Sequence, residues 1–172
     1  MTQIEITAYF EDLATRFVPI SHSALGVKRF CVMDSDLVSD EIKRDLDFSQ
    51  WCMLLEEVGP RIKANESKHF HEYRTFRFTI CKDYSREKAN KAAIKMQSLE
   101  YAKNIFAHII NTYQSSKLFS SLTSFALANI QFSAEFDYYE DILNEDLIGT
   151  DCQLTIYQPF NCKSHDLPAQ WN

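Results

Sequence analysis

The chain has 172 residues, of which 45% are hydrophobic and 24% charged, and its formal net charge is −6. These values are typical of a globular domain and exclude collagen-like and intrinsically disordered compositions. No run of about 18 apolar residues predicts a membrane-spanning helix, and no basic segment followed by an apolar one predicts a signal peptide. We therefore expect one domain over residues 1–160, followed by a tail over residues 161–172.

The negative charge is concentrated in the second half of the chain. Residues 118–162 contain no Lys or Arg. The same region contains these carboxylates: Glu135, Asp137, Glu140, Asp141, Glu145, Asp146 and Asp151. Such a region repels nucleic acid phosphate and favours a basic partner surface, although it is equally compatible with a solvated loop.

The cysteines do not form close pairs along the chain. They are Cys31, Cys52, Cys81, Cys152 and Cys162. Three of them lie within apolar or alternating runs, as small buried thiols do in proteins of a reducing compartment. We therefore expect free structural thiols rather than a disulfide framework.

An amphipathic helix is predicted at the amino terminus. Thr2–Glu5 has the form of a capping box, because a hydroxyl side chain is followed three residues later by a carboxylate. The apolar stripe that follows consists of Ile6, Tyr9, Phe10, Leu13, Ala14 and Phe17. The helix should end near Pro19. Val27–Met33 then alternates as a strand does, whereas Asp34–Asp47 is compatible with either a short helix or an exposed loop.

Two further strands are predicted in the first half. Phe48–Val58 is apolar on both sides, which is typical of a central strand, and Gly59–Pro60 should end it. Glu72–Lys82 alternates between an apolar and a polar face. The polar residues Arg61–His71 between them exceed what a tight turn needs, so we expect a protruding hairpin arm that contacts another molecule.

The longest periodic segment of the chain, Ser85–Tyr113, predicts a long helix. Its expected buried stripe is Ala89, Ala92, Ala93, Met96, Leu99, Ala102, Phe106, Ile109, Ile110 and Tyr113. Lysines line the opposite face, either as a solvated surface or as a contact for an acidic one.

Two strands follow the long helix. Asn129–Tyr138 has the strongest alternation in the chain, and Asp151–Phe160 repeats the pattern after a turn at Asn144–Gly149. We expect these strands to form an antiparallel pair. The order of elements predicts an α+β fold: a mostly antiparallel sheet with the long helix and the shorter N-terminal helix packed on one face.

The opposite face of this sheet should be polar. Its expected residues are Tyr73, Thr75, Arg77, Thr79, Asn129, Gln131, Ser133, Gln153, Thr155 and Tyr157. Such a face can contact water, line a channel or form a subunit contact.

Motifs that would indicate a catalytic or metal site are weak. His69 and His71 lie at alternate positions of an extended segment, but the sequence indicates no third metal ligand. Cys162 and His165 lack a second close cysteine pair. Ser164–Asp166 holds three residue types of a catalytic triad in a row, where neighbouring side chains diverge. We therefore expect no catalytic, cofactor or metal site and a protein that is not an enzyme.

The order of elements, the polar arm and the segment Leu147–Ile156, in which an acidic turn with a glycine leads into the last strand, support a resemblance. The chain resembles the tail-terminator and tail-completion proteins of bacteriophages, which assemble as rings in the tail or in the neck between head and tail. The resemblance covers most of the chain and includes no diagnostic motif.

The resemblance implies a structural protein of the virion, assembled in the host cytoplasm into a ring of about six or twelve copies. It implies other tail or neck proteins as partners, DNA only as a non-specific passing cargo, and no membrane. The interface residues that we then expect are Lys63, Lys68, His69, His71, Glu135, Asp137, Glu140, Asp141, Glu145, Asp146 and Asp151. Of these, Glu135, Asp137 and Asp151 would face the passage for DNA.

Two other functions are compatible with the sequence. One is a cytosolic adaptor that binds a basic partner through the acidic region. The other is a small enzyme or ligand-binding domain with a pocket between the long helix and the sheet, to which His108 would contribute.

Overall fold

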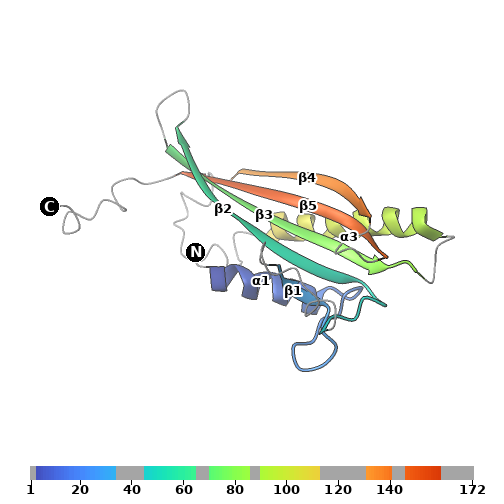
Figure 1. Ribbon diagram of the computed structural model, residues 1–172. Coiled ribbons are helices and arrows are strands. Elements are labelled where there is room, and N and C mark those ends of the chain that lie inside the picture. Colours follow the sequence, from blue (N-terminus) through green and yellow to red (C-terminus); the bar gives the residue numbers. More distant parts are fainter. Residues whose placement is uncertain are drawn as a thin grey trace.

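The computed structural model describes residues 3–33, 45–64, 70–85, 90–112, 131–140 and 146–159. Its elements, in chain order, are α1 (Gln3–Arg16), β1 (Phe30–Val32), β2 (Cys52–Ala64), β3 (Phe70–Asp83), α3 (Lys91–Thr112), β4 (Gln131–Glu140) and β5 (Leu147–Pro159). Figure 1 shows this arrangement. The predicted α+β class is therefore confirmed, as is the predicted order of elements within the described residues.

The strands form one sheet in the order β1-β2-β3-β5-β4. β1 runs parallel to β2, while the other neighbouring pairs are antiparallel, so the sheet is mixed. β2 lies between β1 and β3, so it is an interior strand as its sequence predicted, while β3 occupies the middle of the sheet because β5 returns beside it. Of the helices in the described residues, none is long and apolar enough to cross a membrane.

The N-terminal helix α1 packs with the stripe expected from its sequence. Its buried residues are Ile6, Tyr9, Phe10, Leu13 and Ala14. The ring of Phe10 lies 6.1 Å from that of Phe76 and 5.8 Å from that of Phe78 on β3, measured between ring centroids. Aromatic contacts at this separation stabilise the packing of the helix on the sheet.

The long helix α3 buries only part of the predicted stripe, namely Ala102 and Ile109. The residues that it buries are Ile94, Ser98, Ala102, Ile105 and Ile109. Met96, which the sequence placed in the stripe, is 68% exposed. Where α3 packs on β5, the hydroxyls of Ser98 and Thr150 lie 2.7 Å apart. Close packing against the sheet therefore selects Ser98 over larger apolar side chains nearby.

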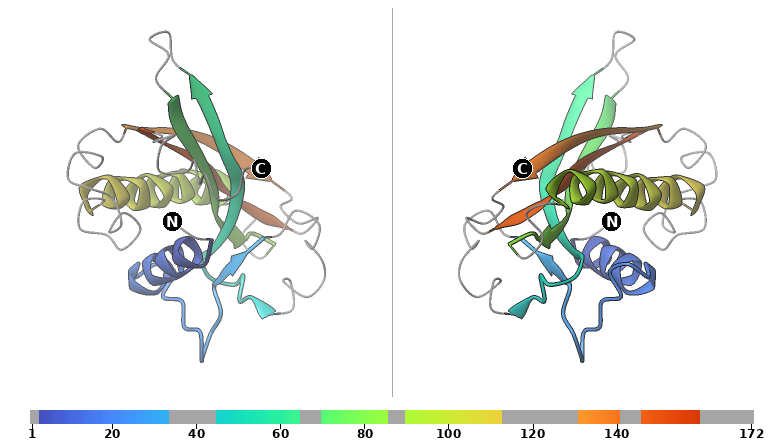
Figure 2. Two further views of the ribbon diagram at one scale, coloured as in Figure 1. Left: turned by 90° about the vertical axis from the view of Figure 1, so that its left-hand side faces the viewer. Right: turned by 90° about the vertical axis from the view of Figure 1, so that its right-hand side faces the viewer.

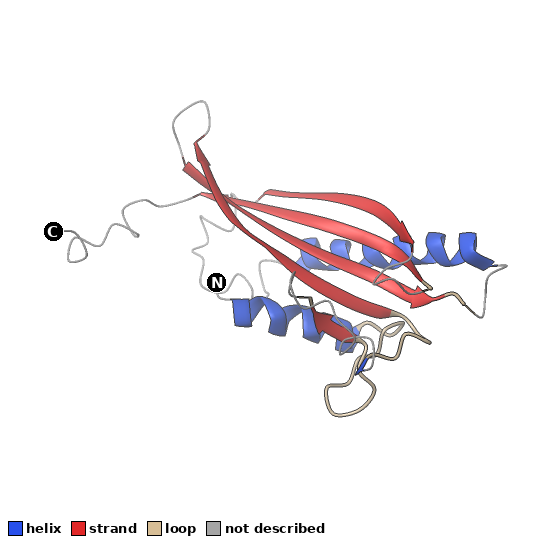
Figure 3. Cartoon of the chain, in the orientation of Figure 1, coloured by secondary structure: helices blue, strands red, loops and turns tan. Residues whose placement is uncertain are grey.

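Both helices and the sheet contribute to one large hydrophobic cluster. Its strand residues include Met53, Leu55, Phe76, Phe78, Ile80, Ile148, Cys152, Leu154 and Ile156; we call this side of the sheet the core face. Tyr101 of α3 links the two helices to the loop before β2, because its ring meets those of Phe17 at 5.4 Å and Trp51 at 5.2 Å. Figure 3 shows the longer strands side by side and the short β1 next to α1.

A second, smaller cluster lies on the other side of the sheet, next to β1. It consists of Leu46, Cys52, Leu54 and Cys81, with Cys31, Met33 and Phe48 packed against it. β2 is therefore apolar on both sides, as predicted, because Met53 and Leu55 contact one cluster and Cys52 and Leu54 the other. The cysteines among the described residues are free thiols, as expected, and burial raises the pKa of Cys31 to about 12.

Several predicted boundaries are wrong. β1 is shorter than Val27–Met33, and β2 continues through Gly59 and Pro60 instead of ending there. β5 begins at Leu147, so Gly149 lies within a strand rather than in the preceding turn. A Cβ atom on Gly149 would lie 2.2 Å from the backbone oxygen of Ile80, which explains why glycine is needed there. Most of the segment Asp34–Asp47 and the tail 161–172 lie outside the described residues.

Candidate functional site

The side of the sheet opposite the core face carries, beyond the smaller hydrophobic cluster next to β1, a polar surface, which we call the polar face. By the register of the strands and the contacts between them, its residues are Glu56, Arg61, Lys63, His71, Tyr73, Thr75, Arg77, Thr79, Ser133, Glu135, Asp137, Asp151, Gln153, Thr155 and Tyr157. The hydroxyls of Thr75 and Thr155 lie 3.2 Å apart across β3 and β5. Side chains of adjacent strands therefore contact one another along this face.

A β-bulge in β2 decides which residues join the polar face. Val58 is opposite Thr75, yet the next paired residue, Arg61, is opposite Tyr73. Two residues of β2, Gly59 and Pro60, thus stand against one residue of β3. Because of this extra residue, Arg61 and Lys63 lie on the same face as Glu56, whereas uninterrupted alternation would place Ile62 there.

The bulge marks the base of the hairpin arm, which consists of Arg61–Ala64 of β2 and Phe70–Tyr73 of β3. Figure 2 shows the arm projecting from the sheet at the end away from α1. Arg61 and Lys63 are exposed. The Lys63 Nζ atom lies 5.7 Å from the centre of the Tyr73 ring, a cation–π contact that holds the lysine on the polar face.

Tyrosines support the base of the arm. The rings of Tyr73 and Tyr157 meet edge to face at 4.8 Å between centroids. The Tyr157 hydroxyl lies 3.0 Å from the Ser133 hydroxyl on β4. Contacts between β3, β5 and β4 therefore hold this end of the polar face in place. We call this end the basic half and define it as Arg61, Lys63, His71 and Tyr73.

The other end of the polar face carries four carboxylates around one guanidinium. We call it the acidic half and define it as Glu56, Arg77, Glu135, Asp137 and Asp151. Arg77 Nη1 donates a hydrogen bond of 3.1 Å to Glu56 Oε2, and Arg77 Nε lies 3.2 Å from Asp151 Oδ2 without hydrogen-bond geometry. Carboxylates exceed the guanidinium, so this half is negative.

Asp151 is the buried member of the acidic half. Its side chain is 7% exposed, and its Oδ1 atom accepts a hydrogen bond of 2.9 Å from the Thr79 hydroxyl. Burial raises the pKa of the Asp151 carboxyl, while Thr79 and Arg77 oppose this rise. Asp137 is directly opposite on β4 and is exposed, as is Glu135. A binding partner would therefore meet Glu135 and Asp137 before Asp151.

The remaining predicted interface residues lie apart from the polar face or outside the described residues. Glu140 pairs with Lys91 and Lys95 of α3, and its hydrogen bonds to these lysines lower the pKa of its carboxyl. Asp146 is exposed just before β5. The predicted interface residues outside the described residues are Lys68, His69, Asp141 and Glu145.

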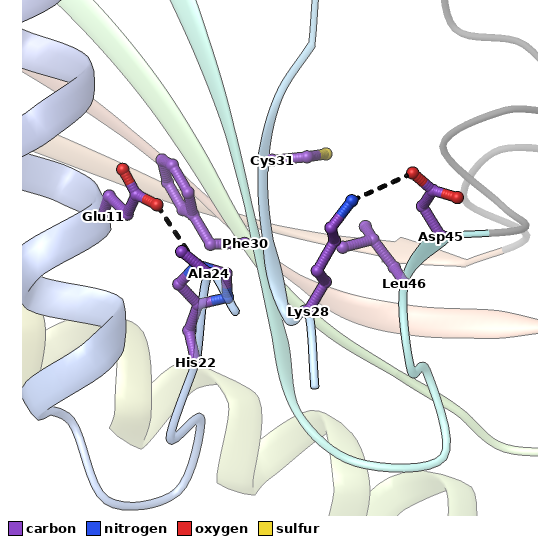
Figure 4. A pocket seen from close by; sticks show the side chains of 8 residues that line it. All are labelled: Glu11, His22, Ala24, Lys28, Phe30, Cys31, Asp45 and Leu46. Carbon is purple, nitrogen blue, oxygen red and sulfur yellow. Dashed lines mark hydrogen bonds and ion pairs between the residues drawn. The ribbon is translucent and has the colours of Figure 1, made fainter. Parts of the chain in front are cut away.

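A buried histidine, His22, lines a hollow of about 440 Å³ beside β1 and was not singled out from the sequence. Its Nδ1 atom accepts a hydrogen bond of 3.1 Å from the backbone N–H of Arg29, so the proton is on Nε2, 3.3 Å from Glu11 Oε1. In Figure 4, Cys31 points away from this pair. His22 therefore anchors the loop before β1, and both of its nitrogens are used. Its burial could not be inferred from a loop sequence.

A second hollow, of about 320 Å³, lies between α1 and α3 and is lined by Leu13, Phe17, Ile105 and His108 among others. His108 is exposed at its edge. The ligand-binding alternative placed a pocket between the long helix and the sheet, whereas this hollow lies between the two helices. Its lining combines three apolar side chains with Arg16, Asn104 and His108.

Among the residues that the structure describes, no group of three or more His, Cys, Asp or Glu side chains is arranged to hold a metal ion. The polar face, with its two halves of opposite charge, is therefore the strongest candidate for a functional surface. No protein-family model and no curated protein matches the chain.

Proposed function

We propose that the chain is a non-enzymatic structural protein of a bacteriophage virion that forms a ring in the tail or in the head-tail connector. In such a ring, the helices would cover the core face of each subunit, and the polar face would contact neighbouring subunits. The proposal rests on the order of elements, on the arm and on the charge of the polar face. Other tail or neck proteins would adjoin the ring, and DNA would pass through it as a non-specific cargo.

The observation that carries the proposal is the arm. A ring forms when each subunit contacts the next through two different surfaces and the rotation between subunits closes. The arm projects at one end of the molecule and exposes Ile62 and Phe70, which are 52% and 46% exposed. Exposed apolar side chains on a projecting hairpin favour contact with another protein over contact with water.

Electron microscopy tests this proposal. The purified chain would be separated by size exclusion, and the largest species would be imaged in negative stain. Closed rings of about six or twelve copies would support the proposal. Isolated particles of single-subunit size at all concentrations would contradict self-assembly and would favour an adaptor that binds a basic partner through the acidic half.

A further inference from the structure

We propose that the basic half of the polar face in one copy binds the acidic half of the polar face in a second copy. This inference rests on the proposed self-assembly and adds to it by naming the two contacting surfaces. It assigns the acidic half to a subunit contact rather than to the wall of a passage for DNA.

The first step of the argument is charge complementarity within one face. The basic half exposes Arg61 and Lys63, and the acidic half exposes Glu135 and Asp137. None of these four side chains forms an ion pair with another described residue. Opposite charges that stay unpaired within a subunit can pair between subunits.

The second step is the distance between the halves. On β3 the row of Thr75 lies between Tyr73 and Arg77, and Lys63 pairs with His71, one row beyond Tyr73. At about 3.3 Å per residue, the six residues from His71 to Arg77 separate the centres of the halves by about 20 Å. This distance exceeds the Debye length of about 8 Å at physiological salt, so the two halves do not neutralise each other through solvent.

The third step concerns the net charge of −6, which opposes self-association. Two negative molecules repel over long distances, but that repulsion is screened beyond about 8 Å at physiological salt. Contacts between Arg61 or Lys63 and a neighbouring Glu135 act at much shorter range and are screened less. At the contact, the attraction between nearby opposite charges therefore exceeds the screened repulsion that arises from the net charge.

The fourth step is that contacts within the subunit hold Lys63 and Arg77 in place. Lys63 is held over Tyr73, and Tyr73 packs on Tyr157 of β5. Arg77 is fixed between Glu56 and Asp151, so it does not neutralise the exposed carboxylates on β4. A side chain that is already held, such as Lys63, loses less freedom on association, which favours binding.

Reciprocal charge reversal tests the inference. One variant carries Arg61→Glu and Lys63→Glu, and the other carries Glu135→Lys and Asp137→Lys. In each variant alone the two halves have the same sign, so the dissociation constant of the subunit contact should rise by about tenfold or more. An equal mixture restores opposite pairs and should recover association, measured by sedimentation velocity at constant total protein.

A matched control reverses two exposed cations away from the polar face, Arg16→Glu and Lys103→Glu. Among the described residues, Arg16 and Lys103 pair only with exposed carboxylates of their own helices, so this control should associate like the wild type. Circular dichroism of each variant checks that the fold is retained. Loss of association in both polar-face variants, recovery in the mixture and no change in the control would support the inference.

The contrary results separate the inference from the proposed function. A wild type that assembles, together with polar-face variants that assemble equally well, overturns the inference alone. Folded variants that lose association and do not recover it when mixed also overturn it. A wild type that stays monomeric at every concentration overturns both the inference and the proposed self-assembly.

Discussion

The contact between α3 and β5 provides a quantitative test of the packing. Ser98 and Thr150 are both 0% exposed, and their hydroxyl oxygens lie 2.7 Å apart. Ser98 Oγ also donates a hydrogen bond of 2.8 Å to the backbone oxygen of Lys95. Since a serine hydroxyl has one proton, Thr150 must be the donor in the contact between the two side chains.

This assignment makes the two single substitutions unequal. Ser98→Ala leaves the Thr150 hydroxyl as a buried donor without its acceptor, which costs about 1–3 kcal/mol. The higher helix propensity of alanine offsets about 0.5 kcal/mol of this cost. Thr150→Val removes the donor and leaves Ser98 bonded to Lys95, so it should cost less. The double variant has no orphaned donor and should be at least as stable as Ser98→Ala.

Urea unfolding of the wild type, both single variants and the double variant measures these free energies in one cycle. The expected coupling energy is about 1 kcal/mol, and Ser98→Ala should lower the Tm by about 2–8 °C. Thr15→Ala is the control, because its hydroxyl bonds to the backbone of Glu11 at an exposed position of α1. Strictly additive costs of the two substitutions would refute the argument that Thr150 depends on Ser98.

Other predictions concern Asp151, Gly149 and the buried thiols. Burial raises the pKa of Asp151, so the folded state keeps the proton on this carboxyl up to a higher pH than the unfolded state does. The free energy of unfolding of the wild type, relative to that of Asp151→Asn, should therefore rise as the pH falls from about 7 to about 4, as urea titrations can measure. Gly149→Ala should destabilise the fold by about 3 kcal/mol or more, because its Cβ would meet the backbone of Ile80, and thermal unfolding with an unchanged Tm would contradict this. Cys52 and Cys81 should react with a disulfide reagent only after unfolding, since both are 0% exposed and burial raises the pKa of each; rapid labelling of the folded protein at these positions would disprove it.

The parts of the fold that could be predicted from the sequence depend on local periodicity. The alternation of Phe76, Phe78 and Ile80 with Arg77 and Thr79 assigned the faces of β3 correctly, since side chains of a strand alternate whatever it pairs with. The apolar stripe of α1 was also predicted correctly, because side chains three and four residues apart share one face of any helix. In each case, one short segment contains the whole signal.

Features that depend on contacts between distant segments could not be predicted in this way. Ser98 is polar, and its burial follows only from its position against Thr150, 52 residues away. Period-2 alternation could not reveal the bulge at Gly59 and Pro60, because a glycine followed by a proline also ends strands. The place of β3 at the centre depends on the return of β5, for which the sequence has no local signal.

The candidate surface was predicted in part. The acidic residues and the arm were recognised from composition and loop length. The acidic residues and the arm residues share one face only because the bulge and the strand register bring Lys63 and Glu56 to the same side of the sheet. The burial of Asp151 against Thr79, 72 residues away, likewise requires the structure.

The measurement that most directly tests the central claim is the mass of the wild-type chain in solution, by light scattering after size exclusion. It would be made over a concentration series at about 0.15 M and about 1 M salt. Association through the two charged halves predicts a multiple of the 20.1 kDa chain at the lower salt, with dissociation at the higher salt. A mass of 20.1 kDa at every concentration and both salt levels would contradict it.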